Sequence, residues 1–358
     1  SSLLINENNN DINYHWLKNF SKEIQSLTDK KKQIMIVSSG SVALGRKQLN
    51  LVKNLSLDEK QAAAAVGQIH LSHAWKEVLK SFNLESAQIL LAPDDTETRR
   101  KHLNARATLL KLLQLNVIPV INENDSVATE EIRFGDNDTL AAMVSSLIEA
   151  DLLVLLTDVD GLFESDPKLG AAGELIDSAF AVDAQLDNLP SKSKNAMGRG
   201  GMVSKIKAAR IAAAGGAHTI IASGRAKDSI RNILHGEQVG TLLAATTDPL
   251  TARKRWIANQ VHFKGVLVLD NGAVLKLRSQ GSSLLSVGVK SVEGNFLRGD
   301  IVKCVDDKGT LVAQGVINYS SDDARTIKGV VSERFSDVLG YLGEEELVHR
   351  DNLIVAPN

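Results

Sequence analysis

The chain has 358 residues, enough for two domains, and its 43% hydrophobic and 23% charged residues are typical of a globular protein. The formal net charge of −2 argues against a protein built to coat nucleic acid or an acidic membrane. The single cysteine, Cys304, excludes an intrachain disulfide and a cysteine metal cluster, and no apolar run approaches the roughly 20 residues that span a bilayer. Ser1–Asn6 lacks the basic and apolar regions of a signal peptide, so we expect a cytoplasmic protein without membrane contact.

Up to about Ala245, short apolar runs alternate with stretches that have apolar residues three and four positions apart. The periodic stretches predict helices at Leu103–Leu115, Thr139–Ala150 and Val203–Ala214. The apolar runs predict strands at Ile34–Val37, Ala87–Leu91, Val117–Ile121, Leu152–Leu156 and His218–Ala222. We therefore predict an α/β fold with a mainly parallel sheet sandwiched by helices. Pro119 suggests that the third strand is irregular or partly unpaired.

Polar residues follow four of these strands at the point where each strand ends. They are Ser38–Ser41, Asn122–Asp125, Thr157–Asp158 and Ser223–Gly224. A single polar turn means little, because loops are polar in general. Ligands of parallel sheets bind beyond the carboxyl ends of the strands, so four such turns favour an active site at this edge.

A further polar cluster, Phe134–Leu140, precedes the helix that we predict to run to Ala150. One interpretation is structural: Asn137 or Asp138 caps the N-terminus of this helix. The other is functional: the Asn137 amide binds a substrate carboxylate, while Asp136 and Asp138 orient a lysine. The two are compatible, because a capped helix N-terminus is itself a site for anions.

A glycine-rich loop, Gly198–Lys205, leads directly into the next predicted helix and places Lys205 in its first turn. Glycines let backbone N–H groups approach an anion, and the helix N-terminus adds a favourable dipole. A lysine at this position can neutralise charge on a phosphoryl group during its transfer. The loop lacks the Gly-Lys-Ser/Thr ending of a Walker A sequence, and an ordinary turn before a helix is the alternative.

The pattern changes near Pro249. Asp248–Trp256 predicts a connector with a short helix, whose basic triplet we assign to a solvated face rather than to nucleic acid binding. Val266–Leu269 followed by Asp270-Asn271-Gly272 predicts a hairpin. With the short β-like runs that follow, it predicts a small, mostly-β, barrel-like domain. The predicted division is residues 1–247, a connector at 248–260, the second domain at 261–340 and a tail at 341–358.

Several of these motifs together resemble the amino acid kinase family. They are Ile36–Ser41, Val120–Asp125, Phe134–Asp138, Leu155–Asp158 and Gly200–Lys205, and the resemblance covers nearly the whole chain. The C-terminal part resembles a PUA domain through Gly281–Leu285 and Gly294–Asp300. The resemblance implies an ATP-dependent kinase. It is nearest to the members that phosphorylate the side-chain carboxylate of L-glutamate to γ-glutamyl phosphate, the first step of proline biosynthesis.

The resemblance also implies roles for individual residues. Ser39, Asp125 and Asn137 would bind glutamate, with Asp125 suited to the ammonium group and the other two to carboxylate oxygens. Lys205 would be the transition-state cation, with Asp136 and Asp138 beside it. ATP would carry its own Mg²⁺, without a protein ligand cage for the metal. The residues implied for the nucleotide are Thr157, Asp158, Arg199, Gly200, Gly201, Met202, Val203, Ser204 and Lys205.

One part of the family pattern is incomplete. Family members open with a strand carrying Val-Val-Lys-x-Gly-x-Ser, whose lysine reaches the phosphates. Ser1-Ser2-Leu3-Leu4 matches only the end of that motif, and no lysine precedes Lys18. We expect this strand to be missing from the printed sequence rather than from the protein. The family also suggests a homo-oligomer that proline inhibits.

Two alternatives stay open. One is a sister kinase that acts on N-acetylglutamate, aspartate or a nucleoside monophosphate; Asp125, as the partner of a free amine, favours glutamate over its acetylated form. The other is an RNA-binding protein, because PUA domains commonly bind RNA. Residues 261–340 contain ten Lys or Arg against nine Asp or Glu, which is no basic footprint, so we do not expect RNA as a partner.

Overall fold

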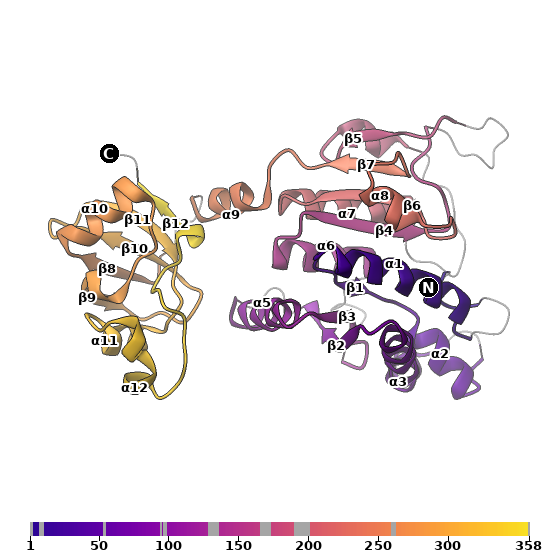
Figure 1. The fold of residues 1–358 in the computed structure, drawn as a ribbon, viewed down its shortest axis with the longest axis horizontal. Coiled ribbons are helices and arrows are strands. Elements are labelled where there is room, and N and C mark those ends of the chain that lie inside the picture. The colour runs from indigo at the N-terminus through magenta and orange to yellow at the C-terminus, as the bar shows by residue number, and fades with distance from the viewer. Residues whose placement is uncertain are drawn as a thin grey trace. The chain divides into compact units, whose positions relative to one another are not determined.

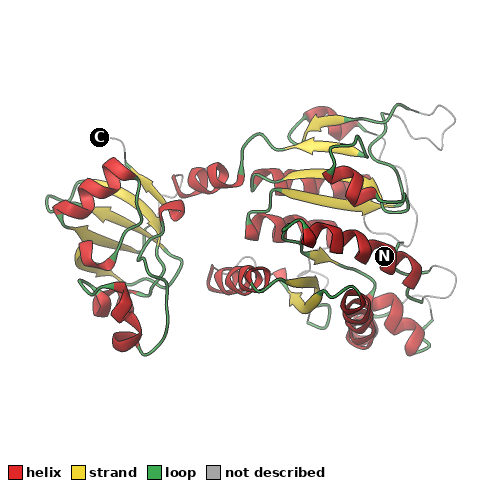
Figure 2. Cartoon of the chain, in the orientation of Figure 1, coloured by secondary structure: helices red, strands yellow, loops and turns green. Residues whose placement is uncertain are grey.

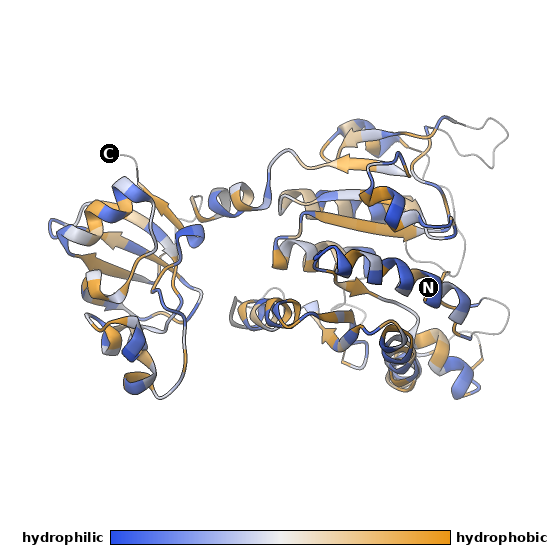
Figure 3. Cartoon of the chain, in the orientation of Figure 1, coloured by the Kyte–Doolittle hydropathy of each residue, from blue (hydrophilic) through white to orange (hydrophobic). Residues whose placement is uncertain are grey.

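The computed structural model describes residues 3–6, 11–52, 55–93, 95, 99–127, 136–164, 173–189, 201–258 and 263–356. The chain folds into two compact units, Ser1–Asp248 and Pro249–Asn358 (Figure 1). Each unit has its own hydrophobic core, and the strands of both are coloured as mostly hydrophobic in Figure 3. Within the described ranges, no helix combines the length and the apolar character needed to cross a membrane.

The first sheet of the first unit has three parallel strands in the order β1-β3-β2, namely β1 (Ile36–Val37), β3 (Val117–Glu123) and β2 (Glu85–Leu91). The central strand β3 alternates its side chains between two cores. Val120 packs with α1 (Tyr14–Asp29) and α3 (Leu57–Ser81), whereas Ile121 packs with α5 (Arg99–Gln114) and α6 (Asn137–Ile148). Helices therefore cover both faces of this sheet.

The second sheet has the order β4-β6-β7-β5, namely β4 (Leu152–Thr157), β6 (His218–Ser223), β7 (Thr241–Ala244) and β5 (Ser178–Phe180). Only the β6–β7 pair is antiparallel. Leu155 packs in a core with α6 and α7 (Met202–Ala214), and the next residue, Leu156, packs with the core of α1 and α3. Helix α6 contacts both sheets and joins them. The short elements of this region are η2 (Ala184–Asn188) and α8 (Ser229–Leu234).

Helix α2 (Ser41–Gln48) crosses α3 at two glycines. A Cβ atom at Gly45 would lie 1.7 Å from the carbonyl oxygen of Ala63, and one at Gly67 would lie 1.8 Å from that of Ser41. No side chain fits between backbones this close. The crossing therefore fixes the start of α2, next to the Ser38–Ser41 turn, against a helix of 25 residues.

The predicted α/β fold, with mainly parallel strands sandwiched by helices, is confirmed, although the described strands of the first unit lie in two sheets rather than one. All five predicted strands are present, and the three predicted helices correspond to α5, α6 and α7. Pro119 lies opposite Ala87 in the regular pairing with β2, but β1 pairs only with Val120 and Ile121. Strand β3 is thus paired on one side only at Pro119, as its missing N–H requires.

The second unit is a mixed five-stranded sheet with helices around it (Figure 2). Its strand order is β12-β11-β10-β8-β9, and Leu267, Val302 and Cys304 are fully buried in its core. The strands are β8 (Gly265–Leu269), β9 (Val289–Gly294), β10 (Ile301–Val305), β11 (Leu311–Val316) and β12 (Leu353–Val355). The helices are α9 (Pro249–Ala258), α10 (Asn271–Gln280), α11 (Ser321–Ile327) and α12 (Phe335–Leu339), with 3₁₀ turns at η3 (Ser286–Gly288), η4 (Ser332–Arg334) and η5 (Arg350–Asn352).

The hairpin predicted at Asp270-Asn271-Gly272 is wrong, because these residues start a helix. Asp270 is the N-cap of α10, and its Oδ1 accepts a hydrogen bond of 2.7 Å from the backbone N–H of Ala273. Aspartate before a helix satisfies a free N–H group, and the same residue type also favours turns. The chain returns to the sheet only at β9, after α10 and η3.

Both ends of the second unit pack on its sheet. Helix α9, which lies in the predicted connector, buries Ile257 against Ile301 and Val316. Gln314 of β11 donates a hydrogen bond of 2.8 Å to the carbonyl oxygen of Ile257. At the other end, β12 lies in the predicted tail and pairs antiparallel with β11.

Candidate active site

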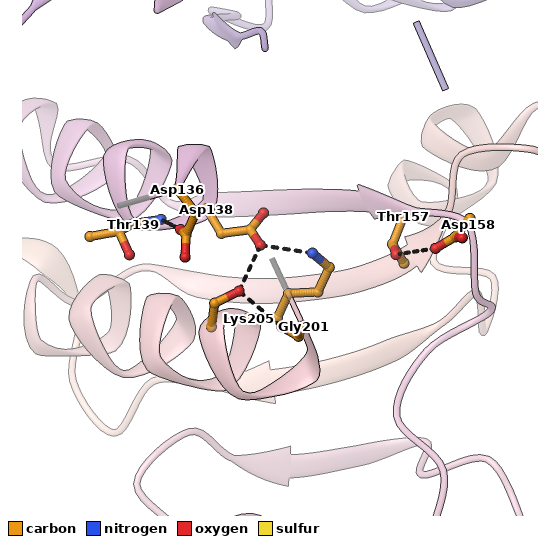
Figure 4. Close-up of polar contacts among 8 residues, drawn as sticks. Asp136, Asp138, Thr139, Thr157, Asp158, Gly201 and Lys205 are labelled. Atoms are coloured by element: carbon orange, nitrogen blue, oxygen red, sulfur yellow. Dashed lines mark hydrogen bonds and ion pairs between the residues drawn. The ribbon is translucent and has the colours of Figure 1, made fainter. Parts of the chain in front are cut away.

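Helix α6 begins at the edge where β3 ends, and its first residues organise the site. Asp136 is the N-cap: its Oδ1 accepts a hydrogen bond of 2.7 Å from the N–H of Thr139 (Figure 4). The structural interpretation that Asn137 or Asp138 caps this helix is therefore corrected. With capping done by Asp136, the side chains of Asn137 and Asp138 make contacts elsewhere.

Asp138 forms an ion pair with Lys205, here called the lysine pair. The Nζ of Lys205 lies 2.7 Å from Oδ2 of Asp138, and the two side chains point toward each other from α7 and α6 in Figure 4. Lys205 is only 8% exposed. The hydroxyl of Ser204 donates a further hydrogen bond of 3.2 Å to the same carboxylate oxygen. Burying a charge is costly unless it is paired, so Asp138 stabilises the buried lysine.

Helix α7 starts at the N-cap Gly201 without a side-chain cap. The first backbone N–H groups of a helix have no partner within the helix, and the helix dipole favours an anion beside them. Lys205 adds a positive charge to this end. The start of α7 is therefore suited to a phosphate group. Phe134, Gly135, Arg199 and Gly200, which the sequence analysis also singled out, lie outside the described residues.

Asn137 belongs to a second group, the amide cluster, which is centred on Asn122 of β3. The Asn137 amide donates a hydrogen bond of 3.1 Å to Oδ1 of Asn122. The Asn122 amide donates in turn to Oε1 of Gln68 at 2.9 Å and to the hydroxyl of Ser41 at 3.3 Å. Ser41 donates to Oδ2 of Asp125 at 3.3 Å. These bonds join one residue of α6 to side chains of α2, α3 and the turn after β3.

Ser39 lies half-buried in the turn between β1 and α2. The next residue, Gly40, is the N-cap of α2 and has φ 121°, a backbone conformation that favours glycine. Like α7, helix α2 has no side-chain cap. The turn thus places the Ser39 hydroxyl next to a helix N-terminus that can receive a carboxylate.

Thr157 and Asp158 lie at the carboxyl end of β4 (Figure 4). The Thr157 hydroxyl donates a hydrogen bond of 3.2 Å to Oδ1 of Asp158. The carbonyl oxygen of Thr157 accepts a hydrogen bond of 2.8 Å from the N–H of Gly224, the residue after β6. The turns that follow β4 and β6 are therefore joined to each other.

The segment that follows Gly224 is held by α1. Oε2 of Glu23 accepts hydrogen bonds from the N–H groups of Ile230 (2.9 Å) and Arg231 (3.1 Å), at the start of α8. Burial raises the pKa of the Glu23 carboxyl above its ordinary value, and these two hydrogen bonds oppose that rise. Glu23 therefore acts as a structural clamp between α1 and α8.

The structure brings the predicted residues into two adjacent groups, because Asn137 and Asp138 are consecutive on α6. Sequence reasoning missed the central position of Asn122, although it lies in the polar run after β3. It also missed Gln68, which is in the middle of a helix, far from any motif. Only the proximity of Gly67 to α2 could have pointed to it, and that proximity depends on the fold.

Comparisons with known proteins identify the families that the two parts of the chain match. Residues 1–223 match the amino acid kinase family, and residues 265–339 match the PUA domain. The chain therefore belongs to the amino acid kinase family and carries a PUA domain after the kinase unit, as the sequence resemblance predicted.

Similarity to individual proteins narrows the relationship within this family. The chain is 47% identical to the glutamate 5-kinase of Teredinibacter turnerae over 356 residues, which cover 99% of this chain and 95% of that protein. It is 48% identical to the glutamate 5-kinase of Thioalkalivibrio sulfidiphilus over 356 residues, which cover 99% of this chain and 95% of that protein. It is 49% identical to that of Methylococcus capsulatus over 336 residues, with 94% and 90% covered.

Proposed function

We propose that this chain transfers the γ-phosphoryl group of ATP to the side-chain carboxylate of L-glutamate, giving γ-glutamyl phosphate and ADP, the first step of proline biosynthesis. One carboxylate oxygen forms a bond to the γ-phosphorus, and the bond from that phosphorus to the oxygen bridging to the β-phosphate breaks. No general base is needed, because the attacking carboxylate is already ionised. The observation that carries the proposal is the adjacency of Asn137 and Asp138, which joins the amide cluster to the lysine pair.

Glutamate binds at the amide cluster in this proposal. The Asp125 carboxylate pairs with the substrate ammonium, and Asn137 and Ser39 donate hydrogen bonds to carboxylate oxygens. Asn122 supports this arrangement because its amide is bonded on both sides and cannot turn without breaking those bonds. The donors are thus oriented before the substrate arrives.

ATP binds at the other half of the site. Lys205 neutralises charge on the transferring phosphoryl group, and Asp138 holds the lysine until the nucleotide enters. Asp136 supports both by fixing the start of α6. Thr157 and Asp158 contact the nucleotide, as does the loop of Arg199, Gly200, Gly201, Met202, Val203 and Ser204.

Mg²⁺ enters with ATP as part of the substrate. Within the described ranges, no three His, Cys, Asp or Glu side chains gather into a metal-binding group. A magnesium ion on ATP uses phosphate oxygens and keeps several waters, so it needs few ligands from the protein. When bound, it neutralises charge on the β- and γ-phosphates.

Three further properties belong to the proposal, and the last two of them rest on the family resemblance alone. They are a cytoplasmic location, assembly into a homo-oligomer and feedback inhibition by proline. Light scattering on the purified protein and a proline titration of the kinase rate test the last two directly.

The reaction is tested by measuring ADP release with L-glutamate, N-acetyl-L-glutamate, L-aspartate and UMP as acceptors. Hydroxylamine in the assay traps an acyl phosphate as a hydroxamate, which identifies phosphorylation on a carboxylate. We expect turnover and hydroxamate with L-glutamate, and loss of both when EDTA removes Mg²⁺. Faster turnover with any of the other acceptors would assign the chain to a sister kinase instead.

A further inference from the structure

Three aromatic rings connect α1 to α3 on the face opposite α6. Trp16 and Phe20 of α1 are stacked, with ring centroids 5.0 Å apart and planes at 19°. Phe20 meets Trp75 of α3 edge to face, with centroids 5.7 Å apart and planes at 74°. Such ring pairs contribute about 0.5–1.5 kcal/mol beyond their buried area, so they keep their relative positions. Trp16, Phe20 and Trp75 are called the aromatic bridge below.

Each outer ring of the bridge donates its indole N–H to a turn at the end of a strand. Nε1 of Trp75 donates a hydrogen bond of 2.9 Å to the hydroxyl oxygen of Ser38, and both residues are buried. Nε1 of Trp16 donates one of 2.7 Å to the carbonyl oxygen of Gly224. Ser38 follows β1 and Gly224 follows β6, so the two bonds end on turns from different sheets.

These turns lead to the two halves of the site. Ser38 directly precedes Ser39, and its hydroxyl lies 3.5 Å from the Ser39 carbonyl oxygen. On the other side, the N–H of Gly224 is bonded to Thr157, and Thr157 is bonded to Asp158. One end of the bridge therefore contacts the glutamate half and the other contacts the nucleotide half.

Strands β1 and β6, which lead to these two turns, do not pair with each other in the described residues. Phosphoryl transfer requires the reacting atoms to be placed about 3–3.5 Å apart, and misplacement by about 1 Å can cost about 10²-fold in rate. Helix α6 joins the sheets on one face through its contacts with β1, β3 and β4. On the opposite face, the aromatic bridge makes hydrogen bonds to both strand ends.

We propose that the aromatic bridge sets the separation of the two substrate pockets, with Trp75 as a positioning residue for glutamate and Trp16 as a positioning residue for ATP. The inference rests on the proposed function. An indole ring has few torsions and one N–H of fixed direction, so its position is transmitted to the carbonyl or hydroxyl it contacts. If the rings only filled the core, loss of either N–H would lower stability without separating the two substrates.

The first measurement compares Trp16→Phe with Trp75→Phe, because phenylalanine keeps an aromatic ring but has no N–H. One neutral hydrogen bond is worth about 0.5–1.5 kcal/mol, so we expect KM shifts of about 3- to 10-fold. Trp16→Phe should raise KM for ATP and leave KM for glutamate unchanged, and Trp75→Phe should do the opposite. Equal shifts for both substrates in both variants, or no shifts, would overturn the proposal.

Calorimetric titration gives a second readout that does not depend on turnover. L-glutamate and the magnesium complex of a non-hydrolysable ATP analogue are titrated separately into each variant. We expect Kd for glutamate to rise only in Trp75→Phe and Kd for the analogue to rise only in Trp16→Phe. If the proposed reaction were wrong, the wild type would fail to turn over glutamate. If the bridge were wrong, the dissociation constants would not separate in this way.

The double variant Trp75→Phe/Ser38→Ala distinguishes positioning from stability. Removing both partners of a buried hydrogen bond leaves neither unsatisfied, so Tm should recover most of what Trp75→Phe alone loses. A positioning role predicts that KM for glutamate stays raised in the double variant. Recovery of both Tm and KM would show a purely structural role. If Trp75→Phe does not fold, Ser38→Ala takes its place: a positioning role predicts a raised KM for glutamate with KM for ATP unchanged, and equal shifts for both substrates would overturn it.

Discussion

Both units bury serine side chains, but among the described residues only the first unit also buries charged ones. In the described part of the first unit, Glu123 and Lys205 are each only 8% exposed, at the end of β3 and in the first turn of α7. In the described part of the second unit, the buried polar residues are the serines Ser286 and Ser321. A buried charge is costly for a core, whereas a serine hydroxyl needs only one partner. The comparison supports the proposal that the chemistry takes place in the first unit.

The second unit keeps its buried titratable groups neutral. Burial raises the pKa of the Cys304 thiol to about 12 and that of the Tyr319 phenol to about 12. The phenol donates a hydrogen bond to the carbonyl oxygen of Glu344. A thiol with such a pKa is not a nucleophile at neutral pH. These groups serve packing, in contrast to the charged lysine pair.

The largest effect expected from this comparison is at Lys205. Lys205→Ala removes the buried cation, so kcat should fall by about 10²-fold or more while the fold survives. Steady-state kinetics with a melting curve measures both. Lys207→Ala is the matched control, because Lys207 is exposed on the same helix. Near-normal turnover in a folded Lys205→Ala protein would exclude Lys205 from the mechanism.

A smaller effect is expected at Asp125. If its carboxylate pairs with the substrate ammonium, Asp125→Ala should raise KM for glutamate by about 30-fold, or about 2 kcal/mol, and affect KM for ATP far less. Asp125→Asn is the informative control, because asparagine can still accept the hydrogen bond from Ser41. A pairing role predicts that both variants are impaired. A purely structural role as acceptor of the Ser41 hydrogen bond predicts that Asp125→Asn behaves like the wild type.

A third prediction tests the comparison between the units directly. A chain that ends at Thr247 keeps every residue of the proposed site, and the first compact unit ends at Asp248. We expect it to phosphorylate glutamate within about threefold of the full-length rate, because compact units can fold alone. A change in the oligomeric state or in the response to proline would be compatible with this prediction. Loss of all activity in a folded truncated protein would contradict the prediction that the first unit is sufficient for the reaction.

The comparison of the two units also leads to a prediction about RNA binding by the PUA domain. Phosphate contacts supply most non-specific affinity for nucleic acid, and residues 261–340 have nearly equal numbers of basic and acidic side chains. We therefore expect no sub-micromolar RNA binding from the isolated second unit. A salt-sensitive shift in an electrophoretic mobility assay at sub-micromolar protein would contradict this.

The smallest effect concerns Glu23, a half-buried carboxylate of the first unit with a structural role. Because burial raises its pKa above the ordinary 4.5, the folded state holds the proton more tightly than the unfolded chain does. The resulting stability is present in acid and is lost as the pH rises through the folded-state pKa. The Glu23→Gln variant has no carboxyl group that titrates at this position. Melting curves should therefore show the wild type losing stability relative to Glu23→Gln as the pH rises from 4.5.

The sequence was most informative where local chemistry determines structure. Strands covered on both faces must be apolar along their length, which made β3 and β4 recognisable as continuous hydrophobic runs. Local signals failed where two structures compete for the same residues. Asp270-Asn271-Gly272 suits a hairpin turn as well as a helix start, and packing decided for the helix. Likewise, any of Asp136, Asn137 and Asp138 could have capped α6, and sequence alone cannot choose between adjacent polar residues.

The site was predictable only in part for the same reason. Turns at strand ends revealed Asp125 and Thr157, because parallel topology brings such turns together. Gln68 and Trp16 carry no local signal, since each meets its partner across a long stretch of chain: Gln68 is 54 residues from Asn122, and Trp16 is 208 residues from Gly224. Contacts of this kind depend on how a helix is placed against a strand or a turn, which the spacing of apolar residues does not specify.

Helix α3 gives the proposed glutamate site an unusual mechanical property. Gly67 touches the backbone of α2, Gln68 holds Asn122, and Trp75 holds Ser38, so one rod of 25 residues contacts the proposed site at three points. A rod displaces its contact points together, whereas a loop lets each move alone. If glutamate binds there as proposed, the site has the stiffness of a helix, and a change of acceptor during evolution is easier to reach through the turns at Ser39 and Asp125 than through α3 itself.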